Sequence, residues 1–180
     1  MRSPSGYNPA QDDVLKTLGV AMIAGQGVEY LLSNCLTYAL HGEPLQTVEQ
    51  LRILLERHSK ATLGQLLRKL RTRVDLHPTF DDTLDRFLQH RNIIAHRLHD
   101  VPGGFDLHSD EGRERLKAFL VQYMVDGHTV SMVMLGVLRG WASQEGIDIN
   151  SDHHLSQRMQ DHLEACLLYT SPSPRDRQKS

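Results

Sequence analysis

Hydrophobic residues recur along this chain with the spacing of an α-helix, and no segment sustains the strict alternation that is typical of a β-strand. The pattern predicts helices over residues 8–41, 48–58, 63–74, 78–100, 109–143 and 152–165. Residues 59–62 separate the second helix from the third. We therefore expect an all-α domain, built as an antiparallel bundle of four to five helices.

Local signals mark several of the predicted helix ends. Asn8 followed by Pro9 is typical of an N-cap and first helical position, and Thr62 and Ser109 are suitable caps further along the chain. The Pro-Gly-Gly sequence at 102–104 must form a turn, because neither residue type favours a continuing helix. These signals separate the central helix from the long helix that follows it.

The first and last long helices each present one apolar stripe. On the first, glycines at 19, 25 and 27 weaken the helix, so we expect a neighbouring helix to approach closely there. The alternative is that these glycines mark a break in the helix. The predicted inward residues are Leu18, Met22, Gly25, Leu32 and Leu36 on the first helix and Leu116, Phe119, Leu120, Tyr123, Gly127, Met134, Leu138 and Trp141 on the last.

Two charged residues lie within predicted apolar faces, one on the first helix and one on the central helix. Glu29 lies inside the stripe of the first helix, and Arg91 lies in the middle of the apolar face of the central helix. A guanidinium stays charged, so on a buried face it needs a carboxylate, a phosphate or water. A Glu29–Arg91 ion pair would satisfy both, and losing one partner of a fully buried pair costs about 3 to 5 kcal/mol. The other interpretation, a direct role of Arg91 in chemistry, is compatible with this pair.

The opposite side of the central helix is polar. His96 is turned by about 140° from Arg91, because five residues separate the two along the helix. Asn92 is four residues from His96, so the two side chains can meet, and an imidazole is the usual general acid or base near neutral pH. Ile93 is flanked on this side by Arg86 and Arg97, which suggests a contact surface.

Composition places the chain among soluble globular proteins. It has 180 residues, of which 39% are hydrophobic and 23% are charged, and we expect one domain over 8–165 after a disordered segment at 1–7. No apolar run is long enough to span a bilayer, and the N-terminus lacks the apolar core of a signal peptide. We expect a cytoplasmic protein without a membrane partner.

The segment 166–180 differs from the rest. Its first eleven residues resemble a translated sequencing adapter, so we treat 166–180 as a non-native tail; the alternative is a natural Ser/Pro-rich extension. The tail contributes three of the cations and one acid, so the formal charge changes from −2 to −4 without it. Cys35 is then the single cysteine, which excludes an intrachain disulfide and agrees with a reducing compartment.

A stretch of basic residues runs from Arg52 to Arg73, where seven Lys or Arg residues accompany one acid, Glu56. It is either a solvated helix face or a patch that attracts phosphates within an otherwise acidic domain. Our candidate RNA-binding residues are Arg68, Lys69 and Arg71 of this stretch, with Arg86 and Arg97 of the central helix.

The segment Arg91-Asn92-Ile93-Ile94-Ala95-His96 resembles the signature of HEPN domains, helical bundles with an arginine, a polar residue and, a few residues later, a histidine. The helical order over about 8–145 is similar to the family more loosely. Many catalytic members are metal-independent endoribonucleases that dimerise, so that two motifs line one cleft, whereas other members only bind or scaffold.

The resemblance implies roles for three residues. His96 would be the acid or base that handles the ribose 2′-hydroxyl or the leaving oxygen, Arg91 would stabilise the phosphorane, and Asn92 would position them. It also implies a homodimer, RNA as substrate, and a toxin–antitoxin or defence setting with a protein antitoxin or regulator. A non-catalytic dimerisation or partner-binding module of the same fold is the alternative.

Neither a cofactor nor a metal is expected. The chain has no Gly-rich phosphate loop and no nucleophile motif. His153, His154 and His162 lack a metal-ligand spacing and an accompanying thiolate, so we interpret them as solvated residues.

Overall fold

The computed structural model describes residues 8–42 and 46–146. The predicted disorder at 1–7, the helix over 152–165 and the tail at 166–180 lie outside this range. The described residues fall into two compact units, which we treat separately: unit 1 contains 8–29 and 76–132, and unit 2 contains 30–42, 46–75 and 133–146. The single domain over 8–165 stays a prediction.

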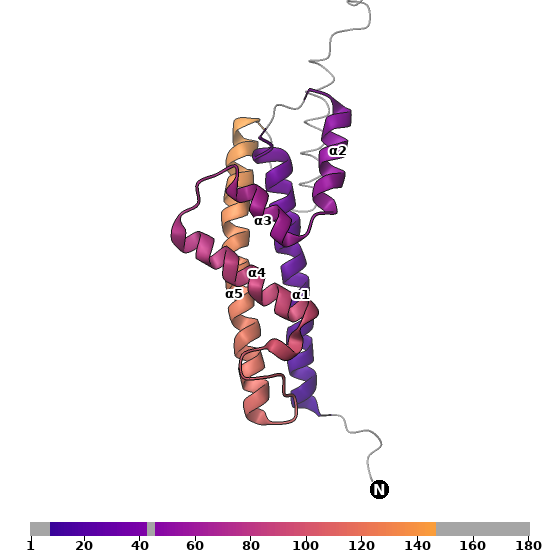
Figure 1. Cartoon of the computed structure of the whole chain (residues 1–180), viewed down its shortest axis with the longest axis vertical. Helices are drawn as coiled ribbons and strands as arrows, with labels where there is room; N and C mark the ends of the chain where they lie inside the picture. The colour runs from indigo at the N-terminus through magenta and orange to yellow at the C-terminus, as the bar shows by residue number, and fades with distance from the viewer. Residues whose placement is uncertain (1–7, 43–45, 147–180) are drawn as a thin grey trace, which may run out of the picture. The chain divides into compact units, whose positions relative to one another are not determined.

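The predicted all-α fold is confirmed (Figure 1). Within 8–42 and 46–146 the chain forms five α-helices, one π-helix and one 3-10 helix, and no strand. The α-helices are α1 (Pro9–Asn34), α2 (Val48–Ser59), α3 (Leu63–Arg71), α4 (Pro78–His96) and α5 (Asp110–Gln144); the π-helix covers Cys35–Ala39 and the 3-10 helix Leu98–Asp100.

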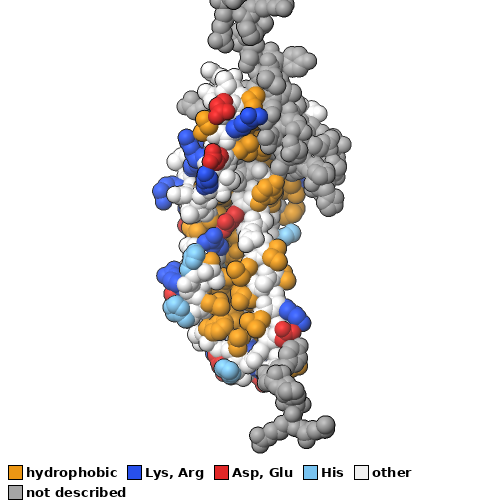
Figure 2. All heavy atoms as spheres, turned by 90° about the vertical axis from the view of Figure 1, so that its right-hand side faces the viewer, with side chains coloured by type: hydrophobic (Ala, Val, Ile, Leu, Met, Phe, Trp, Pro, Cys, Tyr) orange, Lys and Arg blue, Asp and Glu red, His pale blue; other side chains and the backbone are white. Residues whose placement is uncertain are grey.

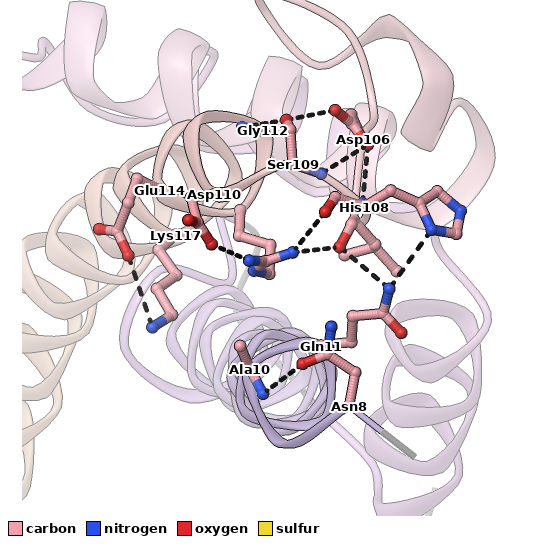
Figure 3. Close-up of polar contacts among 12 residues, drawn as sticks. Asn8, Ala10, Gln11, Asp106, His108, Ser109, Asp110, Gly112, Glu114 and Lys117 are labelled. Atoms are coloured by element: carbon pink, nitrogen blue, oxygen red, sulfur yellow. Dashed lines mark hydrogen bonds and ion pairs between the residues drawn. The ribbon is translucent and has the colours of Figure 1, made fainter. Parts of the chain in front are cut away.

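The predicted helix starts have the expected caps. Asn8 Oδ1 accepts a hydrogen bond from the backbone N–H of Ala10 at 3.0 Å, and Ser109 Oγ accepts one from Gly112 at 3.0 Å (Figure 3). Thr62 forms a full capping box with Gln65 at the start of α3. These short-range signals act within three residues, which is why the sequence alone was sufficient to locate them.

The loop before α5 is held by side chains in unit 1. Asp106 Oδ1 accepts from the backbone N–H of His108 at 2.7 Å, and Asp106 also contacts Ser109 (Figure 3). Gln11 of α1 donates to the Leu107 carbonyl at 3.2 Å. Gly112 is needed here, since a Cβ would lie 2.4 Å from the Asp106 carbonyl oxygen. The loop is therefore fixed to the first turns of both α1 and α5.

The core of unit 1 lies where α4 packs across α1 and α5 (Figure 1). Phe87 of α4 stacks on Tyr123 of α5, with ring centroids 4.9 Å apart. A Cβ on Gly25 would lie 1.9 Å from the Tyr123 hydroxyl oxygen, so the predicted close approach at Gly25 is confirmed. Gly19 and Gly27 have no such neighbour within 4 Å, and for them this prediction is wrong.

The buried faces of α1 and α4 differ from the predicted ones. Gly25, Leu32 and Leu36 are buried as predicted, but Met22 is 45% exposed. The buried stripe of α1 also includes Val14, Ala21 and Val28. On α4, Ile93 is only 7% exposed, so the predicted contact surface around Ile93 is wrong. The reason is that α4 contacts two helices, so a wider arc of it is buried than one stripe provides.

In unit 2 the predicted helix through residue 41 ends as a π-helix. The Leu40 N–H donates to the Cys35 carbonyl at 2.7 Å. This hydrogen bond joins residues five positions apart, which is the wider turn of a π-helix. Arg73 Nη1 donates to the Leu36 carbonyl at 2.9 Å and also to that of Leu40. A side chain more than 30 positions away therefore satisfies the carbonyls at this helix end, and a local pattern cannot predict such a contact.

Within the described ranges, no helix combines the length and apolar character needed to cross a lipid bilayer.

Candidate active site at Arg91 and His96

The predicted ion pair between α1 and α4 is present. Arg91 Nε donates to Glu29 Oε1 at 2.7 Å, and each of the two side chains is 26% exposed. This degree of burial lies between that of a solvated surface pair and that of a core pair. The carboxylate therefore fixes one edge of the guanidinium and leaves its two terminal nitrogens available for other contacts.

One of those nitrogens faces His96. Arg91 Nη1 lies 3.4 Å from His96 Nε2, although the helix turns the two residues about 140° apart. The two residues project from different sides of α4, as predicted, but their side chains still approach each other. His96 is the last residue of α4, and the long arginine side chain spans the angle. A guanidinium can only donate, so this contact requires an unprotonated Nε2. At 3.4 Å the contact is weak.

Asn92, the third residue of the motif, is half-buried. Among the described residues it forms no hydrogen bond with His96, so the side chains that could meet at four-residue spacing do not pair here. The structure thus brings together Arg91, His96 and Glu29, while the positioning role of Asn92 stays a prediction.

A small cavity of about 70 Å³ lies beside the Arg91–Glu29 pair. Such a volume holds a few water molecules, at about 10 to 15 Å³ for each, and not a nucleotide. The cavity is lined by Met22, Gly25, Gln26, Glu29, Arg91, Ile94, Ala95 and Tyr123.

Tyr123 is a residue of this cavity that the sequence did not single out, since it lies on the apolar stripe of α5. The pKa of its phenol is raised to about 12, first by burial and then by the Glu29 carboxylate, while Arg91 acts in the opposite direction. The hydroxyl therefore stays protonated at neutral pH and is a hydrogen-bond donor at the cavity. Gly25 was the signal that could have identified it, because the glycine makes room for this hydroxyl.

The two other arginines of this region have carboxylate partners. Arg86 forms a two-point pair with Asp126, at 2.8 and 2.7 Å, and Gln122 donates to the same carboxylate at 3.0 Å. Arg97 lies 3.7 Å from Asp100 and is more exposed. Arg86 thus neutralises a buried acid in unit 1, and its proposed contact with RNA would have to coexist with that pair.

The predicted basic stretch lies in unit 2. Arg68 and Lys69 line a cavity on this unit, and Arg71 is exposed in the last turn of α3. Arg73, which we counted in the same stretch, instead satisfies backbone carbonyls. The stretch is therefore not one uniform solvated face.

Within residues 8–42 and 46–146, no three His, Cys, Asp or Glu side chains gather closely enough to hold a metal ion. The histidines at 153, 154 and 162 lie outside the described residues.

Comparisons with models of protein families, with curated proteins and with solved structures find no match to this chain.

Proposed function

We propose that this chain is a HEPN-like endoribonuclease that cleaves RNA without a metal ion. The observation that carries the proposal is the placement of Arg91, which Glu29 holds on one edge while its other side reaches His96 Nε2 at 3.4 Å. A fixed cation beside an imidazole, at the surface, would supply both charge stabilisation and a base.

The chemistry that suits this pair is attack by the 2′-hydroxyl of RNA. The 2′-hydroxyl takes the place of Arg91 at Nε2 of His96, and this nitrogen accepts the proton of the hydroxyl, whose oxygen bonds to the adjacent phosphorus. Arg91 stabilises the added negative charge of the phosphorane. The bond to the 5′-oxygen then breaks and that oxygen takes a proton, which leaves a 2′,3′-cyclic phosphate and a 5′-hydroxyl.

A second copy of the chain completes this proposal. One imidazole has one proton to exchange, and a second motif in a shared cleft would supply the acid for the leaving oxygen. The family resemblance favours such a homodimer, in which Asn92 would position the reacting groups. A toxin–antitoxin or defence role, with a protein that restrains the nuclease, belongs to the same proposal.

The second candidate is a non-catalytic module that dimerises or binds a protein partner. It is favoured by exposed apolar residues of α1 in unit 1, and Figure 2 shows hydrophobic side chains gathered on one face of the molecule. Among these residues of α1, Ile23 is 70% exposed. Leu15, Val20 and Met22 of the same helix are also exposed. In this alternative the Glu29–Arg91 pair only holds α1 and α4 together.

Incubation of the purified chain with RNA in EDTA distinguishes the two candidates. The nuclease should cleave without metal and leave 2′,3′-cyclic phosphate ends, and His96→Ala should slow the cleavage by about 100-fold or more. His99→Ala is the matched control, because His99 is an exposed histidine three residues further along. Cleavage that His96→Ala leaves unchanged, or no cleavage by the wild type, would overturn the nuclease proposal.

A further inference from the structure

A second candidate site lies in unit 2, where the end of α2 meets the start of α3. The cavity there has a volume of about 350 Å³, which is at the lower end of the range for small-molecule pockets, about 300 to 1,000 Å³. It is lined by Arg57, Lys60, Ala61, Gln65, Arg68 and Lys69. Four of these six residues are cations, and no carboxylate is among them.

The positive charge of this cavity is poorly compensated. Lys60 pairs with Glu56 at 2.5 Å, in an exposed pair that contributes little. Arg57, Arg68 and Lys69 have no ion pair with any residue in the ranges that the structure describes. The pKa of Lys69 is lowered, first by burial and then by the charges of Arg57 and Arg73. Cations that repel one another around a cavity leave it ready for an anion.

The backbone on both sides of the cavity is well ordered by local contacts. The Thr62 N–H donates to Gln65 Oε1 at 2.9 Å, and Thr62 Oγ1 accepts from the Gln65 N–H at 3.4 Å. This capping box fixes the start of α3 directly after the last turn of α2. Arg57 lies in the last turn of α2 and Lys60 is its C-cap residue, while Arg68 and Lys69 lie in the last turn of α3.

We propose that this cavity binds a phosphate-bearing ligand, with Arg57, Arg68 and Lys69 as its principal contacts. Arginine donates through a planar fork that matches phosphate oxygens, and lysine adds a point charge. The phosphate could belong to a free nucleotide or to the backbone of RNA, since both present the same oxygens. The inference does not rest on the nuclease proposal, because none of the cavity residues belongs to the motif around Arg91.

Isothermal titration calorimetry at low salt tests this site with two probes, inorganic pyrophosphate and a short single-stranded RNA. We expect at least one probe to bind the wild-type chain, and Arg57→Gln and Lys69→Gln each to weaken binding by about tenfold. Binding of pyrophosphate alone assigns the site to free nucleotides, whereas tighter binding of RNA assigns it to the polynucleotide backbone.

Two further variants make the test specific. Arg52→Gln, on α2 but not part of the cavity, should bind like the wild type, and Lys69→Arg should keep most of the affinity because it keeps the charge. Thermal melting checks folding: Lys69→Gln should melt no lower than the wild type, because it relieves repulsion. No binding of either probe to the wild type, or equal binding by the cavity variants and Arg52→Gln, would overturn the proposal.

Discussion

Glu29 and Arg91, 62 positions apart in the chain, meet at 2.7 Å where α1 and α4 contact each other in unit 1. The same guanidinium that Glu29 holds reaches His96 at 3.4 Å. A contact that stabilises the helix pair therefore also determines where the positive charge of the candidate active site lies.

Replacing Glu29 by Gln should lower the stability of the protein. The substitution leaves a partly buried guanidinium without its anion, and we expect the free energy of unfolding to fall by about 1 to 3 kcal/mol. Urea denaturation followed by circular dichroism measures the change. The control is Lys16→Gln, which removes an exposed pair with Asp12 on the same helix and should leave the midpoint unchanged.

Alanine at position 25 should be far more disruptive than alanine at position 27. The new Cβ at Gly25 would meet the Tyr123 hydroxyl at 1.9 Å, whereas at Gly27 it would meet nothing within 4 Å. We expect Gly25→Ala to cost about 1 to 3 kcal/mol and Gly27→Ala to gain up to about 1 kcal/mol from helix propensity. Denaturant melts of both variants provide the comparison.

A double variant identifies the cause of that effect. If the hydroxyl is what the new methyl group meets, Tyr123→Phe combined with Gly25→Ala should recover part of the lost stability. Simple addition of the two single effects would show that the clash lies elsewhere.

His58 should make the protein less stable in mild acid. Its pKa is lowered to about 4, by burial first and then by Lys69, Arg73 and Arg57. The unfolded chain takes up this proton near pH 6.5, so the contribution of His58 is complete above pH 6.5 and is lost as the pH falls towards 4. At pH 5 the loss should be about 2 kcal/mol. Unfolding at pH 7.5 and pH 5 measures it.

The control is a substitution of His58 itself, whose ring forms a hydrogen bond with Thr37. Thr37 Oγ1 donates to the Ser33 carbonyl at 2.8 Å, so at 2.7 Å it accepts from Nδ1–H of His58. His58→Gln should lower stability at pH 7.5 but make it less dependent on pH between 6.5 and 5. A slope identical to that of the wild type would contradict the assignment to His58.

Replacing Arg86 should lower the stability of the protein, whereas replacing Arg97 should not. Arg86→Gln leaves the buried Asp126 without its cation, and we expect a loss of about 2 kcal/mol. Arg97→Gln affects only an exposed contact with Asp100 and should leave the urea midpoint unchanged. Equal midpoints for the two variants would mean that the Arg86–Asp126 pair contributes nothing to stability.

Local signals explain which features were predictable from the sequence. The caps at Asn8, Thr62 and Ser109 act over two or three residues, so the helix starts could be located correctly. The Glu29–Arg91 pair was predictable for a different reason. Two opposite charges on apolar stripes leave few ways to satisfy either of them.

Features that depend on distant contacts were not predictable. At the π-helix Cys35–Ala39, Arg73 donates a hydrogen bond to the Leu36 carbonyl. The hydroxyl of Tyr123 reaches the cavity only because Gly25 lies opposite it on another helix. The meeting of Arg91 and His96 depends on a side-chain conformation at the end of α4, which helical angles do not determine.

The most direct measurement of the central proposal is the single-turnover rate of RNA cleavage in EDTA by the wild type, His96→Ala and His99→Ala. We expect His96→Ala to be slower by about 100-fold or more, as for the loss of a general base, while His99→Ala cleaves at the wild-type rate. Equal rates for all three proteins, or no cleavage by the wild type, would contradict it.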